Sequence, residues 1–352
     1  MNYTIFGESH GTAIGATLTG VPAGLEIDMD ALRFEMSRRA TGKNKLSTAR
    51  KEADEIEWLS GLFEGKTTGT PLTLMIRNTD QHSKDYSQLK TTPRPSHGDY
   101  AGGLRYGGCN DYRGGGHFSG RLTAPLVAAG AIAKQILAQR GIFVGAHIDS
   151  VAGIHDAPLD GVTDQRHLLK QTAQKEFPVL DDDAGAQMQK AILQAREEGD
   201  SVGGTIECAV YGLPAGVGAP DLNENLEGEL ARHLFAVPAV KGIEFGAGFA
   251  LAEMRGSQAN DPFCMENGQV RTRTNHSGGI NGGITNGMPV TFKVVMRPTP
   301  SIGREQETVD LRTGENTTLI IHGRHDPCIV HRAVPVIEAA AALALLLFLK
   351  EK

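Results

Sequence analysis

The amino-acid sequence predicts an α+β fold in which two related halves each contribute strands and helices. The first observation is a recurrence, because GVPAG at residues 20–24 returns as GLPAG at residues 212–216. The second is the order around each copy, where an alternating, strand-like stretch comes before and a helical pattern comes after. The strand-like stretches are residues 16–19 and 205–211, and the helical patterns are residues 29–39 and 222–235. We infer two related strand-and-helix layers that face one another.

A further pair of segments supports the same organisation. GKTTGTPLT at residues 65–73 resembles GITNGMPVT at residues 283–291, and each leads into a strand-like segment. Turns rich in glycine and proline also recur for purely local reasons, so chance similarity is the alternative. We expect one domain over residues 1–352, made of two intertwined halves at about residues 5–125 and 200–345.

Two helices are expected between the repeated segments. Residues 126–139 carry small apolar side chains nearly all round, which suits burial between two layers, and Pro125 fits the first turn. Residues 184–198 form a helical pattern behind three aspartates at residues 181–183. These acids either hold a metal ion or complement the positive end of a helix dipole, and the second interpretation is favoured.

The most apolar run of the chain lies near its C-terminus, at residues 339–349. Pro335 and Glu338 come just before it, and three charged residues, 350–352, follow it directly. The run falls short of the roughly 18 to 20 apolar residues that a membrane-spanning helix needs. We therefore predict a buried C-terminal helix.

Composition narrows the class of protein. The formal net charge is −6 and only 5% of the residues are aromatic, which disfavours nucleic acid and anionic membranes as partners. The four cysteines lie far apart with no CxxC pair, so we expect reduced thiols. The first eleven residues, MNYTIFGESHG, lack the basic and apolar regions of a secretory signal. We expect a cytoplasmic protein.

Three familiar patterns are present but incomplete. GESHG at residues 7–11 matches the GxSxG turn of serine hydrolases, yet only six residues precede it, too few for the strands that must carry such a turn. GLFEGKT at residues 61–67 has three residues between its glycines where a phosphate-binding Walker A loop has four. His322, His325 and Asp326 resemble metal ligands, but no second cluster of matching spacing accompanies them. We expect no metal.

Basic residues gather in two stretches that suit small anionic ligands. Arginine offers a planar fork for carboxylate and phosphate, and glycine-rich backbone offers N–H donors at close range. The first stretch holds Arg38, Arg39, Lys43, Lys45, Arg50 and Lys51, and the second holds Arg94, His97, Arg105, Arg113, His117 and Arg121. The pattern predicts a phosphorylated or carboxylated small molecule as ligand.

Seven segments of this chain resemble those of the chorismate synthase family and follow in the same order. They are GESHG (7–11), RPSHGDY (94–100), DYRGGGHFSGR (111–121), EGDSVGG (198–204), AVKGIEFG (239–246), SGGINGGITNG (277–287) and GRHDPC (323–328). The match runs from about residue 5 to about residue 345. Seven ordered segments are far more specific than any single one.

The resemblance implies a fold, an assembly and a reaction. The fold would be two antiparallel sheets with helices between them, and the assembly a homotetramer with one deep basic site per subunit. The reaction would be an anti 1,4-elimination of phosphate from 5-enolpyruvylshikimate 3-phosphate, which gives chorismate. Reduced FMN would be required without being consumed, since an electron-rich flavin can assist loss of phosphate from a substrate whose ring proton is only weakly acidic.

The resemblance also implies roles for three titratable residues. His10, in GESHG, would protonate the departing phosphate, and His97, in RPSHGDY, would stabilise the charge of the reduced flavin. Asp326, in GRHDPC, would relay a proton at flavin N5. Histidine and a partly buried aspartate can supply such chemistry near neutral pH. A catalytically silent flavin- or anion-binding protein is the alternative, and the presence of all three residues argues against it.

Binding residues carry over from the same segments. The implied FMN contacts are His117, Phe118, Ser119, Pro238, Ala239, Gly282, Arg297, Pro298, Thr299, Pro300, Ser301 and Arg324. The implied ligands of substrate anions or NADP are Arg39, Lys45, Arg94, Arg113 and Arg121. We expect NADPH only as an external source of reductant, with a separate flavin reductase. Departures from the family pattern are Thr41 for proline, Lys45 for arginine and Leu122 for glutamate.

Overall fold

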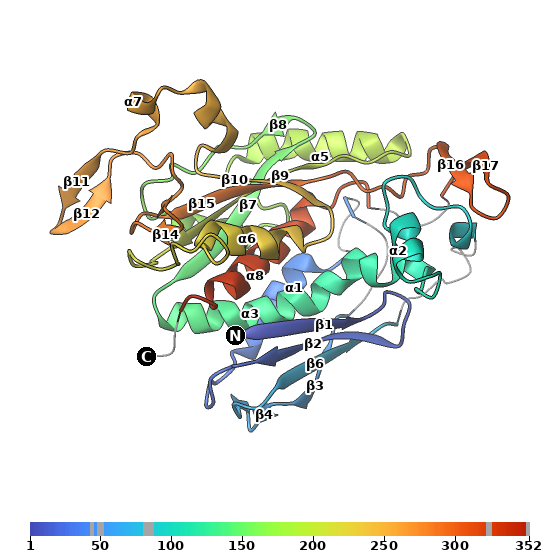
Figure 1. Ribbon diagram of the computed structural model, residues 1–352, viewed down its shortest axis with the longest axis horizontal. Helices are drawn as coiled ribbons and strands as arrows, with labels where there is room; N and C mark the ends of the chain where they lie inside the picture. Colours follow the sequence, from blue (N-terminus) through green and yellow to red (C-terminus); the bar gives the residue numbers. More distant parts are fainter. Residues whose placement is uncertain (43–45, 48–52, 80–87, 322–325, 350–352) are drawn as a thin grey trace.

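The computed structural model describes the chain except residues 43–45, 48–52, 80–87, 322–325 and 350–352. Two antiparallel sheets enclose a layer of helices (Figure 1). This arrangement confirms the predicted α+β sandwich. The strands of the smaller sheet run in the order β1 (Asn2–Gly7), β2 (Ala13–Thr19), β6 (Leu72–Arg77) and β3 (Ile56–Ser60). Those of the larger sheet run in the order β10 (Val240–Phe245), β15 (Val290–Met296), β9 (Gly204–Tyr211), β7 (Phe143–Val151) and β8 (Ile154–His155).

Four helices fill the space between the sheets, and two more lie against the larger sheet. The inner helices are α1 (Met29–Arg39), α3 (Thr123–Gln139), α6 (Leu226–Phe235) and α8 (Val330–Leu345). The outer helices are α4 (Arg166–Thr172) and α5 (Asp182–Glu197), both of which contact β7. Strand β7 is buried along nearly its whole length because helices cover both of its faces.

The remaining elements are short. They are β4 (Leu62–Phe63), β5 (Lys66–Thr67), α2 (Asp99–Arg105), the 3-10 turns η2 (Arg113–Phe118), η3 (Gly120–Leu122) and η4 (Gly248–Glu253), α7 (Gly256–Ala259), and the strand pairs β11 (Phe263–Glu266) with β12 (Gln269–Thr272), β13 (Ile280–Asn281) with β14 (Ile284–Thr285) and β16 (Gln306–Asp310) with β17 (Glu315–Leu319). None of these hairpins was predicted from the sequence. The β11–β12 hairpin projects from the end of the molecule opposite to α2 (Figure 1).

The internal repeat appears in the hydrogen bonds. In the first half Thr67 Oγ1 donates to Pro22 O at 2.5 Å and accepts from the backbone N–H of Leu25 at 3.0 Å. In the second half Thr285 Oγ1 donates to Pro214 O at 2.7 Å and accepts from Val217 at 2.9 Å. Thr67 and Thr285 therefore hold the two recurring turns through equivalent hydrogen bonds.

The helix predictions hold in kind, with corrections to where the helices begin. Residues 29–39 form α1 as predicted, whereas α3 begins at Thr123 and α5 at Asp182. Asp181 caps α5 by accepting from Asp183 N and Ala184 N, so the acidic run serves the helix end. The prediction that a helix begins at residue 222 is wrong. Helix α6 begins at Leu226, because the side chain of Asn225 accepts a hydrogen bond from Gly228 N and caps the helix.

The predicted buried C-terminal helix is present as α8. It begins at Val330, before the apolar run, and includes both Pro335 and Glu338. Glu338 is 1% exposed, yet it pairs with Arg38 at 2.6 Å and Lys134 at 2.7 Å. These partners on α1 and α3 neutralise an acid that would otherwise be too costly to bury.

Helices α3 and α8 approach each other closely in the core. A Cβ atom at Gly130 would lie 2.2 Å from the Cβ of Ala339, so only glycine fits there. Residues 120–139 are long and apolar enough to cross a membrane, but 78% of the relevant window is buried inside the protein. We interpret this segment as a core helix.

Candidate active site

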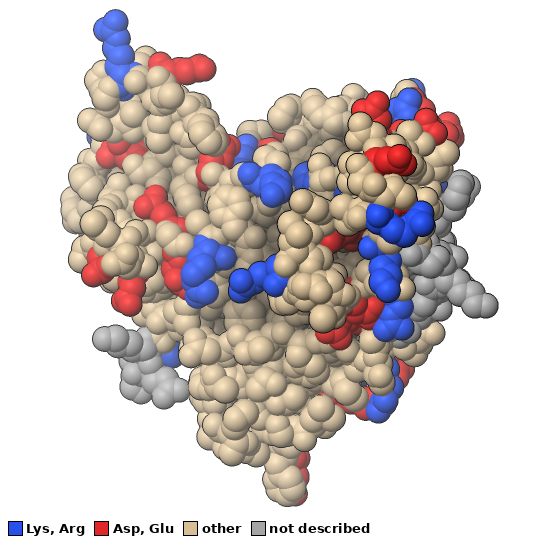
Figure 2. Space-filling view, turned by 45° about the vertical axis from the view of Figure 1, so that its right-hand side comes forward, with Lys and Arg blue, Asp and Glu red and all other residues tan. Residues whose placement is uncertain are grey.

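Most of the described residues predicted for the site come from loops at one end of the sandwich. These loops are the β1–β2 connection, the segment before α2, the turn η2 and the segment after β15. Figure 2 views the molecule with the α2 side turned forward and shows Lys and Arg side chains gathered around a hollow.

The two predicted catalytic histidines lie against consecutive glycines of η2. A Cβ at Gly114 would meet Nε2 of His10 at 2.6 Å, and a Cβ at Gly115 would meet Nε2 of His97 at 3.3 Å. Gly114, Gly115 and Gly116 all have positive φ, between 54° and 84°, which glycine alone adopts readily. The glycine turn therefore lets backbone pass directly beside both imidazole rings.

His97 belongs to a buried ionic cluster with Arg94 and Asp99. Nδ1 of His97 lies 2.7 Å from Asp99 Oδ1, while Arg94 grips Asp99 through Nε at 2.7 Å and Nη2 at 2.8 Å. Burial raises the pKa of Asp99, but hydrogen bonds from Arg94 and His97 outweigh it and hold that pKa well below its ordinary value. Asp99 is therefore ionised at neutral pH.

The predicted flavin segment, residues 297–301, touches this cluster and the Asp326 segment. Arg94 Nη1 donates to Ser301 Oγ at 3.1 Å, and Arg297 Nη1 donates to Ser96 O. Thr299 Oγ1 donates to the backbone carbonyl of Asp326 at 2.7 Å. The structure therefore brings this segment, Arg94 and Asp326 into one connected site.

Other predicted flavin residues divide into near and distant groups. Ala239 accepts a hydrogen bond from Arg297 N at 3.0 Å, and His117 Nδ1 lies 3.0 Å from Gly7 O. Phe118 packs so closely over α2 that a Cβ at Gly102 would meet its ring at 2.4 Å. Gly282 lies in the turn between β13 and β14, away from α2 (Figure 1), so this chain does not bring it to the others.

Arg39 and Arg121 share one buried carboxylate. Nη1 of Arg39 donates to Asp54 Oδ2 at 2.8 Å, and Nη1 of Arg121 donates to Asp54 Oδ1. Thr123 and Asn78 accept the Nε–H groups of the same two arginines, each at 3.0 Å. All three charged residues are buried. They form a fixed platform at the C-terminal end of α1.

The electrostatics of this platform are strongly coupled. Burial lowers the pKa of Arg39 to about 9, with Asp54 opposing the shift and the charges of Arg332 and Arg121 adding to it. At this pKa Arg39 stays protonated at neutral pH. Three arginines facing Asp54 and Asp326 leave an excess of positive charge, which attracts anions.

Asp326 faces the first turn of α8. Both of its carboxylate oxygens lie 2.9 Å from Nη1 of Arg332, whose Nε donates to Arg39 O at 3.1 Å. Lys45 and Arg324 lie outside the described residues, as do His322 and His325. Within the described part of the chain, no group of three or more His, Cys, Asp or Glu side chains is placed to hold a metal ion.

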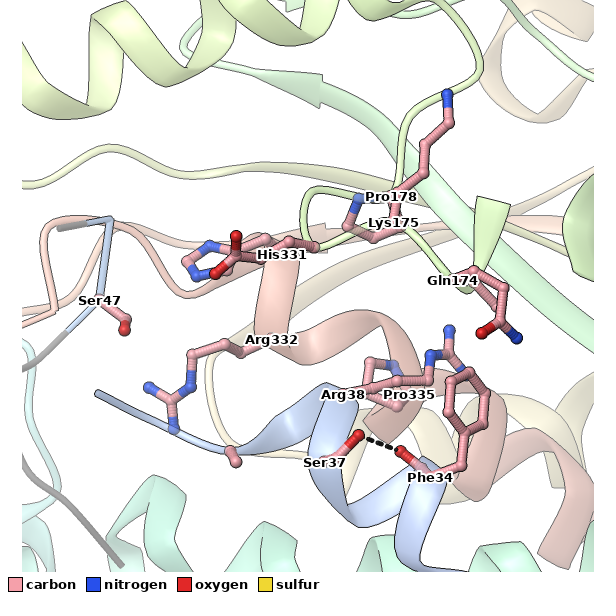
Figure 3. A pocket seen from close by; sticks show the side chains of 13 residues that line it. Phe34, Ser37, Arg38, Ser47, Gln174, Lys175, Pro178, His331, Arg332 and Pro335 are labelled. Atoms are coloured by element: carbon pink, nitrogen blue, oxygen red, sulfur yellow. Dashed lines mark hydrogen bonds between the residues drawn. The ribbon is translucent and has the colours of Figure 1, made fainter. Parts of the chain in front are cut away.

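Two cavities adjoin these clusters. One, of about 250 Å³, lies between the end of α1, the start of α8 and the loop before α5, and the side chains of Arg38, His331 and Arg332 line it (Figure 3). The other, of about 320 Å³, is lined by Arg94, His97 and the strand β16. Both therefore open beside residues that the sequence singled out.

Sequence reasoning missed the charged partners of the predicted residues. Asp54, Asp99, Asp111 and Arg332 each pair with a residue that was predicted. Asp99 and Asp111 lie within two residues of His97 and Arg113, so local spacing carried a signal. Asp54 is 67 residues from Arg121, and nothing local pointed to it. Leu122, where the family has glutamate, is instead packed in the core.

Comparison with known proteins gives a consistent result. A family model described as chorismate synthase matches residues 1–349. A chorismate synthase from Thermococcus kodakarensis is 44% identical over 348 residues, covering 98% of this chain and 94% of the relative. One from Dehalococcoides mccartyi is 48% identical over 342 residues, covering 97% and 93%. A crystal structure titled as chorismate synthase matches with a TM-score of 0.75 and 28% identity, covering 98% of this chain and 90% of the other.

Proposed function

The chain belongs to the chorismate synthase family, which carries out the last step of the shikimate pathway, and we propose that it does so with reduced FMN. The reaction eliminates phosphate from 5-enolpyruvylshikimate 3-phosphate and yields chorismate. The observation that carries the proposal is the placement of His10 and His97 against Gly114 and Gly115 of a single turn. Two proton-handling groups thereby line one glycine-walled site.

The residues around this turn fit a planar, phosphorylated cofactor. Arg94, Ser301 and Arg297 contribute cationic and hydroxyl groups around the His97 segment. A cavity of about 320 Å³ that Arg94 and His97 help to line offers room for a flat ring system beside the imidazole of His97. Reduced FMN held by these residues would supply the electron density that assists loss of phosphate from the allylic position of the substrate.

The side chains of this protein would handle the charge and the protons. His10, buried and held beside Gly114, is proposed to donate a proton to the departing phosphate. Asp326, fixed by Arg332, is proposed to accept a proton. Arg39 and Arg121 are proposed to hold the substrate anions together with Arg113 and Lys45. A fixed positive field stabilises developing negative charge without reorganisation at the moment of reaction.

Assembly and supply of reductant complete the proposal. We propose a cytoplasmic homotetramer, supported by the resemblance and by the exposure of Phe249, Phe263 and Met265 near the projecting hairpin. Light scattering of the purified protein measures the assembly. An external flavin reductase is proposed to supply reduced FMN, with NADPH acting only through it.

The proposal is tested by anaerobic phosphate release from 5-enolpyruvylshikimate 3-phosphate. We expect release with dithionite-reduced FMN and none with oxidised FMN, whether or not NADPH is added. Release on oxidised FMN plus NADPH alone would show that the chain reduces its own flavin. Binding of both ligands without release would indicate a catalytically silent binding protein.

A further inference from the structure

We infer that Asp99 is a positioning residue that fixes the imidazole of His97, with Nδ1 as the hydrogen-bond donor and Nε2 left for the site. This inference rests on the proposed function, because it takes His97 as the residue that faces the cofactor. It adds a residue that neither the sequence patterns nor the comparisons assign.

Both carboxylate oxygens of Asp99 have hydrogen-bond partners. Oδ1 accepts from His97 Nδ1 at 2.7 Å and from Arg94 Nη2 at 2.8 Å. Oδ2 accepts from Arg94 Nε at 2.7 Å and from Arg94 N at 3.1 Å. The carboxylate is 5% exposed. Each carboxylate oxygen therefore accepts two hydrogen bonds, which satisfies the hydrogen-bonding capacity of an ionised Asp99.

Asp99 and Arg94 both lie within hydrogen-bond distance of His97 Nδ1. Arg94 Nη2 also lies 3.0 Å from this nitrogen, and arginine can only donate. If Arg94 were the partner, Nδ1 would carry no proton. The contact with Asp99 is shorter and involves a charged acceptor, which makes it the stronger bond. An ionised carboxylate oxygen can only accept, so the 2.7 Å contact with Asp99 Oδ1 places the proton on Nδ1.

The contact of Nδ1 with Asp99 decides which ring nitrogen of His97 faces the turn η2. With Nδ1 committed to Asp99, Nε2 is the nitrogen beside Gly115, where a Cβ would come within 3.3 Å of it. His97 is 14% exposed, so the ring has little freedom to turn. Arg94 carries the same restraint to Ser301 through its Nη1. One carboxylate therefore orients the ring and part of the predicted flavin segment.

The variant Asp99→Asn tests the tautomer directly. Its single carbonyl oxygen suits the donors of Arg94, and its amide N–H then points at His97 Nδ1, which favours the wrong tautomer. We expect the ratio of affinities for reduced over oxidised FMN to fall at least tenfold. Converted for a two-electron couple, this corresponds to a potential of bound FMN that is about 30 mV more negative. We also expect kcat to fall on the order of 100-fold.

A double variant separates orientation from a structural role. If Asp99 acts through His97, then His97→Gln and His97→Gln/Asp99→Asn share one flavin potential and one kcat. Additive losses overturn the inference, as does an unchanged potential in Asp99→Asn. The exposed Asp30, which pairs with Arg33, provides a matched control, because Asp30→Asn should change neither quantity.

A second pair of variants and a measurement without substrate separate this inference from a folding defect and from the proposed function. If Asp99→Asn fails to fold because Arg94 loses its partner, the pair Arg94→Gln and Arg94→Gln/Asp99→Asn removes that buried cation from both members. The same tenfold difference is expected between them, and its absence overturns the inference. The flavin potential is measured without substrate, so a wild-type protein that binds FMN but releases no phosphate contradicts the proposed function alone.

Discussion

A single guanidinium nitrogen of Arg332, Nη1, lies 2.9 Å from both carboxylate oxygens of Asp326. Nε of Arg332 donates to Arg39 O, so the first turn of α8 joins Asp326 to the end of α1. Thr299 Oγ1 donates to the backbone carbonyl of Asp326 at 2.7 Å. These contacts fix an acid that the sequence could name but could not place.

Replacing Asp326 by asparagine tests its proposed role in proton transfer. Asparagine keeps the size and much of the hydrogen bonding but cannot accept a proton, so we expect kcat to fall by roughly 100- to 10,000-fold. FMN and substrate titrations should show binding close to wild type. Asp182→Asn, on the exposed face of α5, is the control. Near-normal kcat in Asp326→Asn would make the residue structural.

Asp54 is expected to be essential for stability because it neutralises two buried arginines. Asp54→Asn leaves Arg39 and Arg121 without their shared carboxylate, and breaking a buried pair in this way costs about 3 to 5 kcal/mol. Urea unfolding measures the loss. Glu57→Gln, which breaks an exposed pair with Arg77, should have little effect. Equal effects of the two variants would contradict this account.

Glu338 makes stability depend on acidic pH. Burial raises its pKa, but the charges of Arg38 and Lys134 outweigh this and lower the pKa of Glu338 to about 2. Because the folded-state pKa is depressed, the stabilisation is complete above the unfolded value near 4.5 and is lost as pH falls toward 2. Unfolding free energies measured between pH 6 and pH 3 should decline less steeply in Glu338→Gln. An identical slope in both proteins would exclude this contribution.

His147 should have the opposite dependence, at alkaline pH. Its ring nitrogens lie 2.9 Å from Asp156 Oδ2 and 2.9 Å from Glu207 Oε2. Burial opposes the charge, but these hydrogen bonds raise the pKa of His147 to about 9. The stabilisation is therefore complete below about pH 6.5 and is lost as pH rises through 9. His147→Gln should remove this alkaline decline in unfolding free energy, and a decline that persists unchanged would assign it to other groups.

The sequence predicted those parts of the fold that depend on local patterns. The helix at residues 29–39 follows from periodicity. The recurring GxPAG turns could be recognised in the sequence, whereas the threonines that hold them could not. The start of α8 did not follow. Pro335 and Glu338 look like helix boundaries, and the partner that permits burial of Glu338, Arg38, is 300 residues away.

The site shows the same division. His10, His97 and Arg94 could be named because each lies in a short matching segment. Their orientation could not, since it comes from the glycine turn and from Asp99. Asp54 is 67 residues from Arg121, so the sequence did not reveal that Arg39 and Arg121 share this partner. Tertiary contacts between distant segments carry no local signal.

Reduced FMN is proposed to take part in the elimination without being consumed. The direct measurement is the amount of chorismate formed per reduced FMN oxidised, followed anaerobically by absorbance with catalytic amounts of FMN and enzyme. We expect many molecules of chorismate for each FMN, with the reduced-flavin spectrum unchanged at the end. Oxidation of one reduced FMN for every chorismate formed would contradict it.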